Sequence, residues 1–249
     1  MGLLKKKIRQ IRNRPSSSSE SSLNQLQAQI AKQNGKDLCL DLGSGSIGVE
    51  DPDFTTIDIN PKSGADYIGD IKYLFVDHFN KTIEDDYPSL MNFPVGHYQL
   101  IRAVHFIEHI PWIYHDQMFK WVFESLADGG AFWIGTPNLE FIAKIYIKNL
   151  YRIYKGKDVK YPDDGHSLVR KHVSTDMVKW VNYKIFSGQS PLDKHQAIYD
   201  KSLLFQTLRE NGFNKISMFA GHFLSAVAYK PLNFTSPVDE AVRRAVGEK

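Results

Sequence analysis

Residues 38–46 read Leu38-Cys39-Leu40-Asp41-Leu42-Gly43-Ser44-Gly45-Ser46, a short apolar run that contains one acid and leads into two glycines. The run from Leu38 to Leu42 has the length and bounds of a buried strand. The glycines let the backbone turn tightly and leave no Cβ between the backbone and a ligand. A carboxylate beside such a turn suits a ligand that carries an amine and hydroxyls. We therefore expect a binding site to begin at this stretch.

The spacing of the glycines also allows a different interpretation. Gly43, Gly45 and Gly48 spell G-x-G-x-x-G, the fingerprint of a dinucleotide site. That fingerprint needs a helix that starts at the turn and holds a pyrophosphate at its N-terminus. Pro52 and the next apolar run follow too soon for such a helix, and Asp58 comes earlier than the fingerprint's acid, which lies about 20 residues on. A dinucleotide site and a turn without a ligand remain the alternatives.

Two further strands are expected directly after this turn. The first is Phe54–Ile59, with Asp58 near its carboxyl end, and the second is Ala65–Ile71, which ends in Gly-Asp-Ile. Ligands of open α/β sheets lie at the carboxyl ends of the strands. A carboxylate at the position of Asp58 can accept hydrogen bonds from both hydroxyls of a ribose.

A fourth strand runs from Tyr98 into the sequence His105-Phe106-Ile107-Glu108-His109. Three roles are open for the polar side chains of this exit. They could form a metal pair, although there is no His-Glu-x-x-His helix. They could act as acid or base, since histidine titrates near neutral pH. They could also cap and orient the loop, which is the role that we favour for Glu108 and His109.

The remaining elements alternate in the manner of an α/β domain. We expect a helix over Trp112–Ala127 that Asp128-Gly129-Gly130 ends, because glycine suits the left-handed position after a helix. The other expected elements are a strand over Ala131–Asn138, a helix over Leu139–Tyr154, a helix over Leu203–Glu210, and two antiparallel strands over Ile216–Ala220 and Leu224–Tyr229.

Composition limits the classes of function. The chain has 249 residues and a net charge of +3, which is too small to indicate a nucleic-acid partner. Its single cysteine, Cys39, excludes an internal disulfide and a zinc cluster of cysteines. It has no apolar run of the ~18 residues that a membrane span needs, and no secretory signal. We therefore expect a cytoplasmic protein.

The ends and one internal segment differ in character from the rest. Residues 1–22 form a basic, serine-rich tail, whose helical face of Leu4, Ile8 and Ile11 could contact an anionic membrane surface. Residues 155–200 form an insertion of the kind that often selects the substrate, and residues 231–249 form a second tail. Of the insertion's histidines, His195 is our choice for substrate contact or proton transfer; we expect no metal site.

The motifs in this order resemble those of class I S-adenosylmethionine (SAM) methyltransferases. The resembling pieces are Asp-Leu-Gly-x-Gly, the acid that ends the second strand, Gly-Asp-Ile, Ile-Glu-His, and Gly-Gly followed by Thr-Pro-Asn. Ser187-Gly188-Gln189 and Lys194-His195-Gln196 resemble a stretch of a bacterial, type 11/12-like branch that has a short first glycine turn. The resemblance implies a doubly wound, mostly parallel seven-stranded α/β sheet over residues 23–230, with a Rossmann-like fold.

The resemblance also implies SAM as the cofactor and a set of binding residues. Asp41, Gly43, Ser44 and Gly45 would form the first motif, Asp58 and Ile59 would hold the ribose, Asp70 and Ile71 would clamp the adenine, and His105 would lie near the methionine end. His105, His109 and His195 are the candidate catalytic residues.

The expected reaction is methyl transfer to a small-molecule acceptor, with a sugar or glycan precursor as the candidate. An NAD(P)-dependent sugar-modifying oxidoreductase, which would need a Tyr-x-x-x-Lys pair, is one alternative. A non-catalytic relative that keeps the fold to bind a partner is the other.

Overall fold

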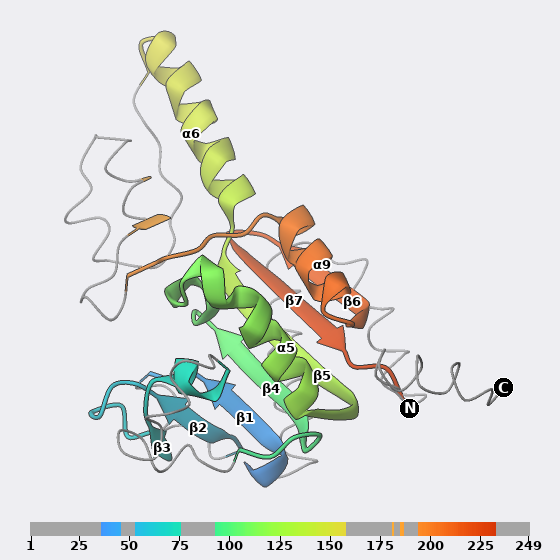
Figure 1. Ribbon diagram of the computed structural model, residues 1–249. Coiled ribbons are helices and arrows are strands. Elements are labelled where there is room, and N and C mark those ends of the chain that lie inside the picture. Colours follow the sequence, from blue (N-terminus) through green and yellow to red (C-terminus); the bar gives the residue numbers. More distant parts are fainter. Residues whose placement is uncertain are drawn as a thin grey trace, which may run out of the picture.

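The computed structural model describes residues 36–45, 53–75, 93–157, 181, 185–186 and 194–232. Within them, seven strands form one sheet in the order β3-β2-β1-β4-β5-β7-β6 (Figure 1). The strands are β1 (Cys39–Leu42), β2 (Thr55–Asp58), β3 (Tyr67–Ile68), β4 (Tyr98–Val104), β5 (Leu126–Pro137), β6 (Asn214–Ala220) and β7 (Phe223–Tyr229). The expected mostly parallel, Rossmann-like α/β fold is confirmed.

The strand order reverses between β1 and β4. Leu40 pairs with Thr55 of β2 on one side and with Ile101 of β4 on the other, both in parallel register. Only β7, which runs antiparallel to both β5 and β6, departs from the parallel arrangement, as predicted for the two closing strands. The carboxyl ends of β1, β2 and β4 therefore share one edge, and this reversal is the usual place for a ligand.

The α-helices that the structure bounds within the described ranges are α5 (His115–Ser125), α6 (Leu139–Tyr154) and α9 (Lys201–Glu210). The bounds of α6 are those predicted. It begins where the Asn138 side chain accepts hydrogen bonds from the Glu140 and Phe141 amides, and it extends away from the sheet (Figure 1). The side chain of Leu150 is 45% exposed on this projecting helix.

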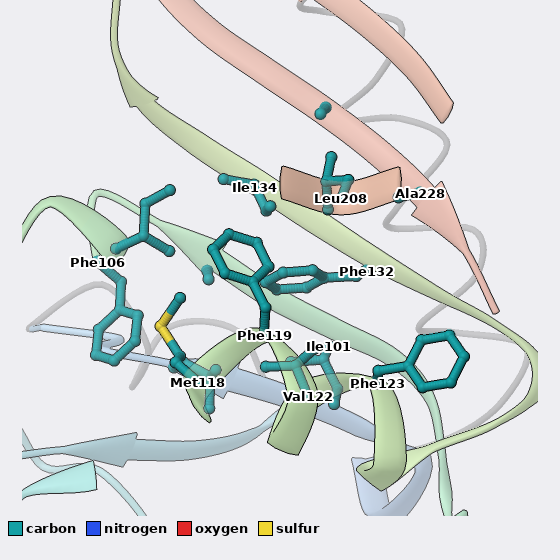
Figure 2. Packing of buried hydrophobic residues seen from close by; sticks show 14 of the residues in the cluster. Ile101, Phe106, Met118, Phe119, Val122, Phe123, Phe132, Ile134, Leu208 and Ala228 are labelled. Atoms are coloured by element: carbon teal, nitrogen blue, oxygen red, sulfur yellow. The ribbon is translucent and has the colours of Figure 1, made fainter. Parts of the chain in front are cut away.

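The main core lies between one face of the sheet and the two helices α5 and α9. Figure 2 shows Phe119 of α5 against Phe132 of β5, with Leu208 of α9 nearby. A smaller cluster on the other face contains the fully buried Cys39 and Phe54 with Trp133. Neighbouring residues of one strand point to opposite faces, which explains why both clusters draw on the same strands.

A buried polar pair crosses the main core. His115 Nε2 donates a hydrogen bond to the Ile110 carbonyl oxygen at 2.9 Å, which leaves Nδ1 to accept one from the Tyr199 hydroxyl. Burial of the ring lowers the pKa of His115 below its usual value, and burial of the phenol raises the pKa of Tyr199. Both groups are therefore held in their neutral forms.

The Asp128-Gly129-Gly130 segment differs from the prediction. Helix α5 ends at Ser125, and these residues lie inside β5 as an irregularity of the ladder, because Tyr98 pairs with Leu126 whereas Leu100 pairs with Ala131. Gly129 takes a φ of 79°, and its amide donates a hydrogen bond to the Lys230 carbonyl oxygen. The expectation of a helix cap is wrong because strand partners on both sides extend β5 through the glycines.

Several predictions concern residues outside the described ranges. These are the basic tail with its serine-rich linker, most of the 155–200 insertion, and nearly all of the C-terminal tail. None of the described helices is long and apolar enough to cross a membrane.

Candidate functional site

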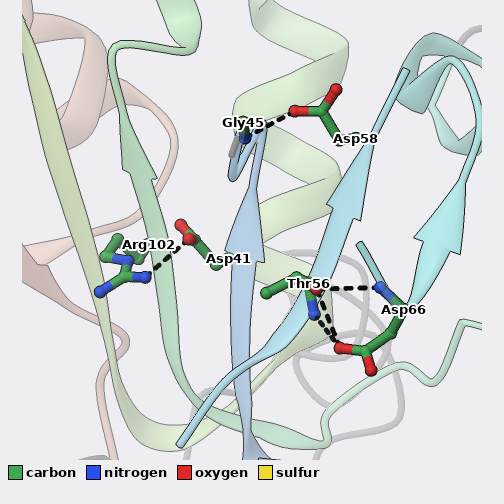
Figure 3. A network of polar contacts seen from close by, with 6 residues as sticks. All are labelled: Asp41, Gly45, Thr56, Asp58, Asp66 and Arg102. Carbon is green, nitrogen blue, oxygen red and sulfur yellow. Dashed lines mark hydrogen bonds and ion pairs between the residues drawn. The ribbon is translucent and has the colours of Figure 1, made fainter. Parts of the chain in front are cut away.

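The glycine turn after β1 is fixed to the end of β2. The amides of Gly43 and Ser44 both donate hydrogen bonds to the Ile57 carbonyl oxygen, at 2.9 and 3.3 Å. The Gly45 amide donates to Asp58 Oδ2 at 2.7 Å, as Figure 3 shows. Gly43 and Gly45 have φ values of 68° and 57°, which favour glycine. Four of the residues predicted for the cofactor are thereby brought together.

Asp58 lies at the carboxyl end of β2, with 9% of its surface exposed. Its Oδ1 accepts a hydrogen bond from the Asn60 amide at 2.7 Å, and its Oδ2 accepts the one from Gly45. Each carboxylate oxygen can accept a second bond. Asp58 can therefore hold two hydroxyl donors while its position is fixed by the backbone. Ile59 follows it directly and is half-buried.

The two sides of the turn differ in the space that they leave. A Cβ added at Gly43 would lie 2.4 Å from Cδ2 of Phe106, whereas one added at Gly45 would meet no atom of the described residues within 4 Å. The hydroxyl of Ser44, which is 8% exposed, has no hydrogen-bond partner among these residues. One side of the turn is thus closed by Phe106, while no described residue closes the side at Gly45.

Asp41 lies within β1 and forms an ion pair with Arg102 of β4. Its Oδ2 is 2.6 Å from Arg102 Nη2, and the side chains of Asp41 and Arg102 are 7% and 14% exposed (Figure 3). The guanidinium also stacks on Phe54, with Cζ 3.9 Å from the ring centroid. Arg102 was not predicted as part of the site, although a charged residue inside an apolar strand was a usable signal.

Asp70 and Ile71 lie at the same edge, since the Gly69 amide donates to the Asp58 carbonyl oxygen at 2.9 Å. Asp70 Oδ1 caps the 3-10 helix η3 (Ile71–Leu74) through the Lys72 amide, and its Oδ2 lies 3.1 Å from Lys72 Nζ. The side chain of Ile71 is 5% exposed and packs in the main core. Asp70 and Ile71, which were predicted to clamp the adenine, therefore lie at the same edge of the sheet as Asp58. The Asp70 carboxylate already caps η3.

His105 occupies the exit of β4. Its φ of 55° is uncommon for a residue with a side chain, and its amide donates to the Gly135 carbonyl oxygen at 2.8 Å. The half-exposed imidazole places Nδ1 3.2 Å from Glu108 Oε1 and packs edge-on against Phe223. Such backbone conformations persist where neighbouring contacts hold them, and they are frequent at functional sites.

The other two candidate histidines meet next to this exit. His109 lies in the 3-10 helix η5 (Ile107–His109), and its ring centroid is 5.0 Å from that of His195. Glu108, which is fully buried, links this pair to His105. The structure therefore groups His105, His109 and His195, and it adds the Glu108 side chain, for which the sequence favoured only a capping role. The other two histidines of the 155–200 insertion, His166 and His172, lie outside the described residues.

The pair that the oxidoreductase alternative requires lies elsewhere. Tyr151 and Lys155 have the Tyr-x-x-x-Lys spacing, but they come at the far end of α6, where Tyr151 is 63% exposed. At 1.5 Å per residue this end is about 20 Å from the start of the helix at the sheet edge (Figure 1). Their position does not suit chemistry on a ligand at the glycine turn.

Comparison with known proteins finds distant structural likenesses. No protein-family model and no curated protein matches the sequence. A SAM-dependent methyltransferase from Archaeoglobus fulgidus is similar, with 14% identity, 85% of this chain and 94% of that one covered, and a TM-score of 0.47. A possible exported protein from Bordetella parapertussis follows, with 11% identity, coverage of 85% and 69%, and a TM-score of 0.42.

A third similar structure is a 1,6-didemethyltoxoflavin N1-methyltransferase from Burkholderia thailandensis. It has 9% identity, coverage of 82% and 76%, and a TM-score of 0.41. SAM-dependent methyltransferases are thus among the solved structures that this chain resembles. At TM-scores below 0.5 these likenesses carry no argument about its chemistry, so the function has to be argued from the site itself.

Proposed function

We propose that this protein is a SAM-dependent methyltransferase that acts on a small-molecule acceptor. The observation that carries the proposal is the Asp58 carboxylate, which is fixed by two backbone amides beside a glycine turn with an open side. The glycine turn follows β1, which borders the reversal of the strand order, and Asp58 ends the neighbouring strand β2. Ligands of such sheets bind at this edge.

The residues of the turn fit an adenosyl ligand. Asp58 would accept hydrogen bonds from the two ribose hydroxyls with the lone pairs that the backbone leaves. The open side of Gly45 lets the ligand approach the backbone, and the unpartnered Ser44 hydroxyl can donate to it. Ile71 and Asp70 would border the adenine, and Asp41 would act mainly by fixing Arg102 and the end of β1.

The cofactor would supply an electrophilic methyl group on a sulfonium. What this chain supplies is the position of the acceptor, because methyl transfer depends chiefly on holding the acceptor in line with that group. His105 is half-exposed at the exit of β4, and His109 and His195 lie beside it. They would orient an acceptor, and one of them would remove a proton where the acceptor must lose one.

A sugar or glycan precursor is the acceptor that we propose. The support comes from the sequence, because Ser187-Gly188-Gln189 and Lys194-His195-Gln196 resemble the bacterial branch named above, and that branch often occurs in surface-polysaccharide settings. We also propose, again from the sequence, that the basic tail of residues 1–22 contacts anionic membranes and that the 155–200 insertion caps the substrate. A cytoplasmic location is a third proposal from the sequence.

The direct test of activity is the formation of S-adenosylhomocysteine from SAM with a panel of nucleotide sugars and simple glycosides. Turnover that depends on one acceptor class supports the proposal. Tight binding of NAD together with an absence of binding of SAM and S-adenosylhomocysteine would replace it with the oxidoreductase.

A further inference from the structure

We propose that Glu108, His109 and His195 hold a divalent transition-metal ion at the carboxyl edge of the sheet. Each of the three side chains offers one ligand atom, and these atoms all lie within 4.8 Å of one another. The set consists of two imidazoles and one carboxylate, which is a donor combination that suits Zn²⁺, Co²⁺, Mn²⁺ or Fe²⁺. The sequence alone predicted no metal, because the third ligand comes from a segment 86 residues further along the chain than His109.

The two segments that supply the ligands are fixed to each other by hydrogen bonds. The amides of Gln196 and Ala197 donate to the Glu108 carbonyl oxygen at 2.6 and 3.2 Å. The Gln196 side-chain amide donates to the His109 carbonyl oxygen at 2.8 Å. His195 is thereby held directly over η5, so the three ligands are arranged before any ion binds.

The strongest indication comes from Glu108. Its side chain is fully buried, and Oε2 has no hydrogen-bond partner among the described residues. A buried carboxylate with an unpartnered oxygen is costly unless a positive charge lies close to it. An ion between Glu108 and the two histidines would supply that charge.

The surroundings of the cluster complete the site in the way that metal ligands are usually supported. His105 Nδ1 lies 3.2 Å from Glu108 Oε1 and orients the carboxylate. His109 Nδ1 lies 3.4 Å from the Lys194 carbonyl oxygen, a contact of the kind that orients a metal-binding imidazole.

Binding would draw the ligands together. In a tetrahedral site two ligand atoms that are each about 2.1 Å from the ion lie about 3.4 Å apart, so a pair at the 4.8 Å limit of the present cluster would close by about 1.4 Å. Side-chain rotation of the two half-buried histidines can provide this. Three protein ligands leave further coordination positions for oxygen ligands from solvent or substrate.

The position of the ion suggests its role, and this step rests on the proposed methyltransferase function. Phe106, which closes the glycine turn, lies between His105 and the ligands of η5 in the sequence, so the ion would border the acceptor side of the cofactor site. With the ion bound, His109 and His195 would act as ligands and not as bases, and a hydroxyl bound to the ion would lose its proton to solvent more readily. Its oxygen would then form the bond to the methyl carbon, while the carbon–sulfur bond breaks and its electron pair stays on sulfur.

Titration of tag-free, chelator-treated protein with Zn²⁺ and Co²⁺ tests the site without any need for turnover. We expect one ion per chain, with weak binding of Mg²⁺, which prefers oxygen ligands. His105→Ala, which removes the orienting partner, should weaken Zn²⁺ binding by about 10–100-fold, and His195→Ala should weaken it more. Glu108→Gln, which keeps the size of the side chain, provides a second ligand variant should His195→Ala prove poorly folded.

His97→Ala is the matched control, because His97 lies just before β4 at the opposite end of that strand. It should bind Zn²⁺ as the unmodified protein does. Equal affinity in unmodified protein, His195→Ala and Glu108→Gln would overturn the metal site, as would the absence of a bound ion. Titration with S-adenosylhomocysteine in parallel separates the two proposals, since cofactor binding without metal binding rejects only the metal site.

Discussion

The two glycines of the turn differ in what they contribute to stability and to ligand binding, and a pair of alanine substitutions can separate the two contributions. Both residues have positive φ, so alanine at either position costs about 1 kcal/mol of stability through backbone strain. At Gly43 the new Cβ would also lie 2.4 Å from Phe106 Cδ2, and crowding of this kind adds about 1–3 kcal/mol. We expect Gly43→Ala to lower the free energy of unfolding by about 2–4 kcal/mol and Gly45→Ala by about 1 kcal/mol.

Urea denaturation of both variants, followed by fluorescence, measures this difference. Phe106→Leu provides the internal check, because the smaller side chain should reduce the cost of Gly43→Ala to that of strain alone. The effect on ligand binding should be large at Gly45, although the effect on stability is small. The new Cβ of Gly45→Ala lies on the open side of the turn and should weaken binding of S-adenosylhomocysteine by at least tenfold. Equal stabilities of the two alanine variants, or cofactor binding by Gly45→Ala that matches the unmodified protein, would refute the reasoning.

Three further predictions concern the stability of the scaffold and are measured by urea denaturation. Arg102→Met should lower the free energy of unfolding by about 3–5 kcal/mol, because it leaves the Asp41 side chain, which is 7% exposed, without its cation. Adding Asp41→Asn should recover much of this loss. Additive effects of the two substitutions would contradict a stabilising ion pair. Burial lowers the pKa of His115, so the unfolded state takes up protons first and stability should fall as pH drops below about 6.5, by up to about 1.4 kcal/mol per pH unit. His115→Gln should lose this pH dependence of stability. An unchanged slope in that variant would be evidence against His115 as its source. Asp200→Ala should cost about 1 kcal/mol through loss of the cap on the Leu203 amide, whereas Ser202→Ala should cost little.

The succession of the strands along the chain, and the edge of the sheet at which the candidate residues lie, could be predicted because both follow from local patterns. A short apolar run with glycines after it gave β1 and the turn, and an acid at the end of the next run gave Asp58. Helix α6 was predicted to the residue, since the Asn138 cap and the apolar periodicity agree.

The contacts that complete the site could not be predicted in the same way, because they join residues that lie far apart in the sequence. Asp41 and Arg102 are 61 positions apart and meet only through the register of β1 and β4. The approach of His195 to Glu108 depends on backbone hydrogen bonds from Gln196 and Ala197. The glycines of β5 were misassigned because the same residues suit a helix end and a strand irregularity, and only the pairing partners decide between them.

Calorimetric titration with S-adenosylhomocysteine, SAM and NAD tests the central claim, that Asp58 and the glycine turn hold an adenosyl cofactor. The proteins to compare are the unmodified chain, Asp58→Ala, and Asp128→Ala as a control at an exposed carboxylate of β5. The expected result is binding of the two adenosyl compounds by the unmodified protein and the control, with loss in Asp58→Ala and little affinity for NAD. Undiminished binding by a folded Asp58→Ala, or binding of NAD alone, would contradict the assignment.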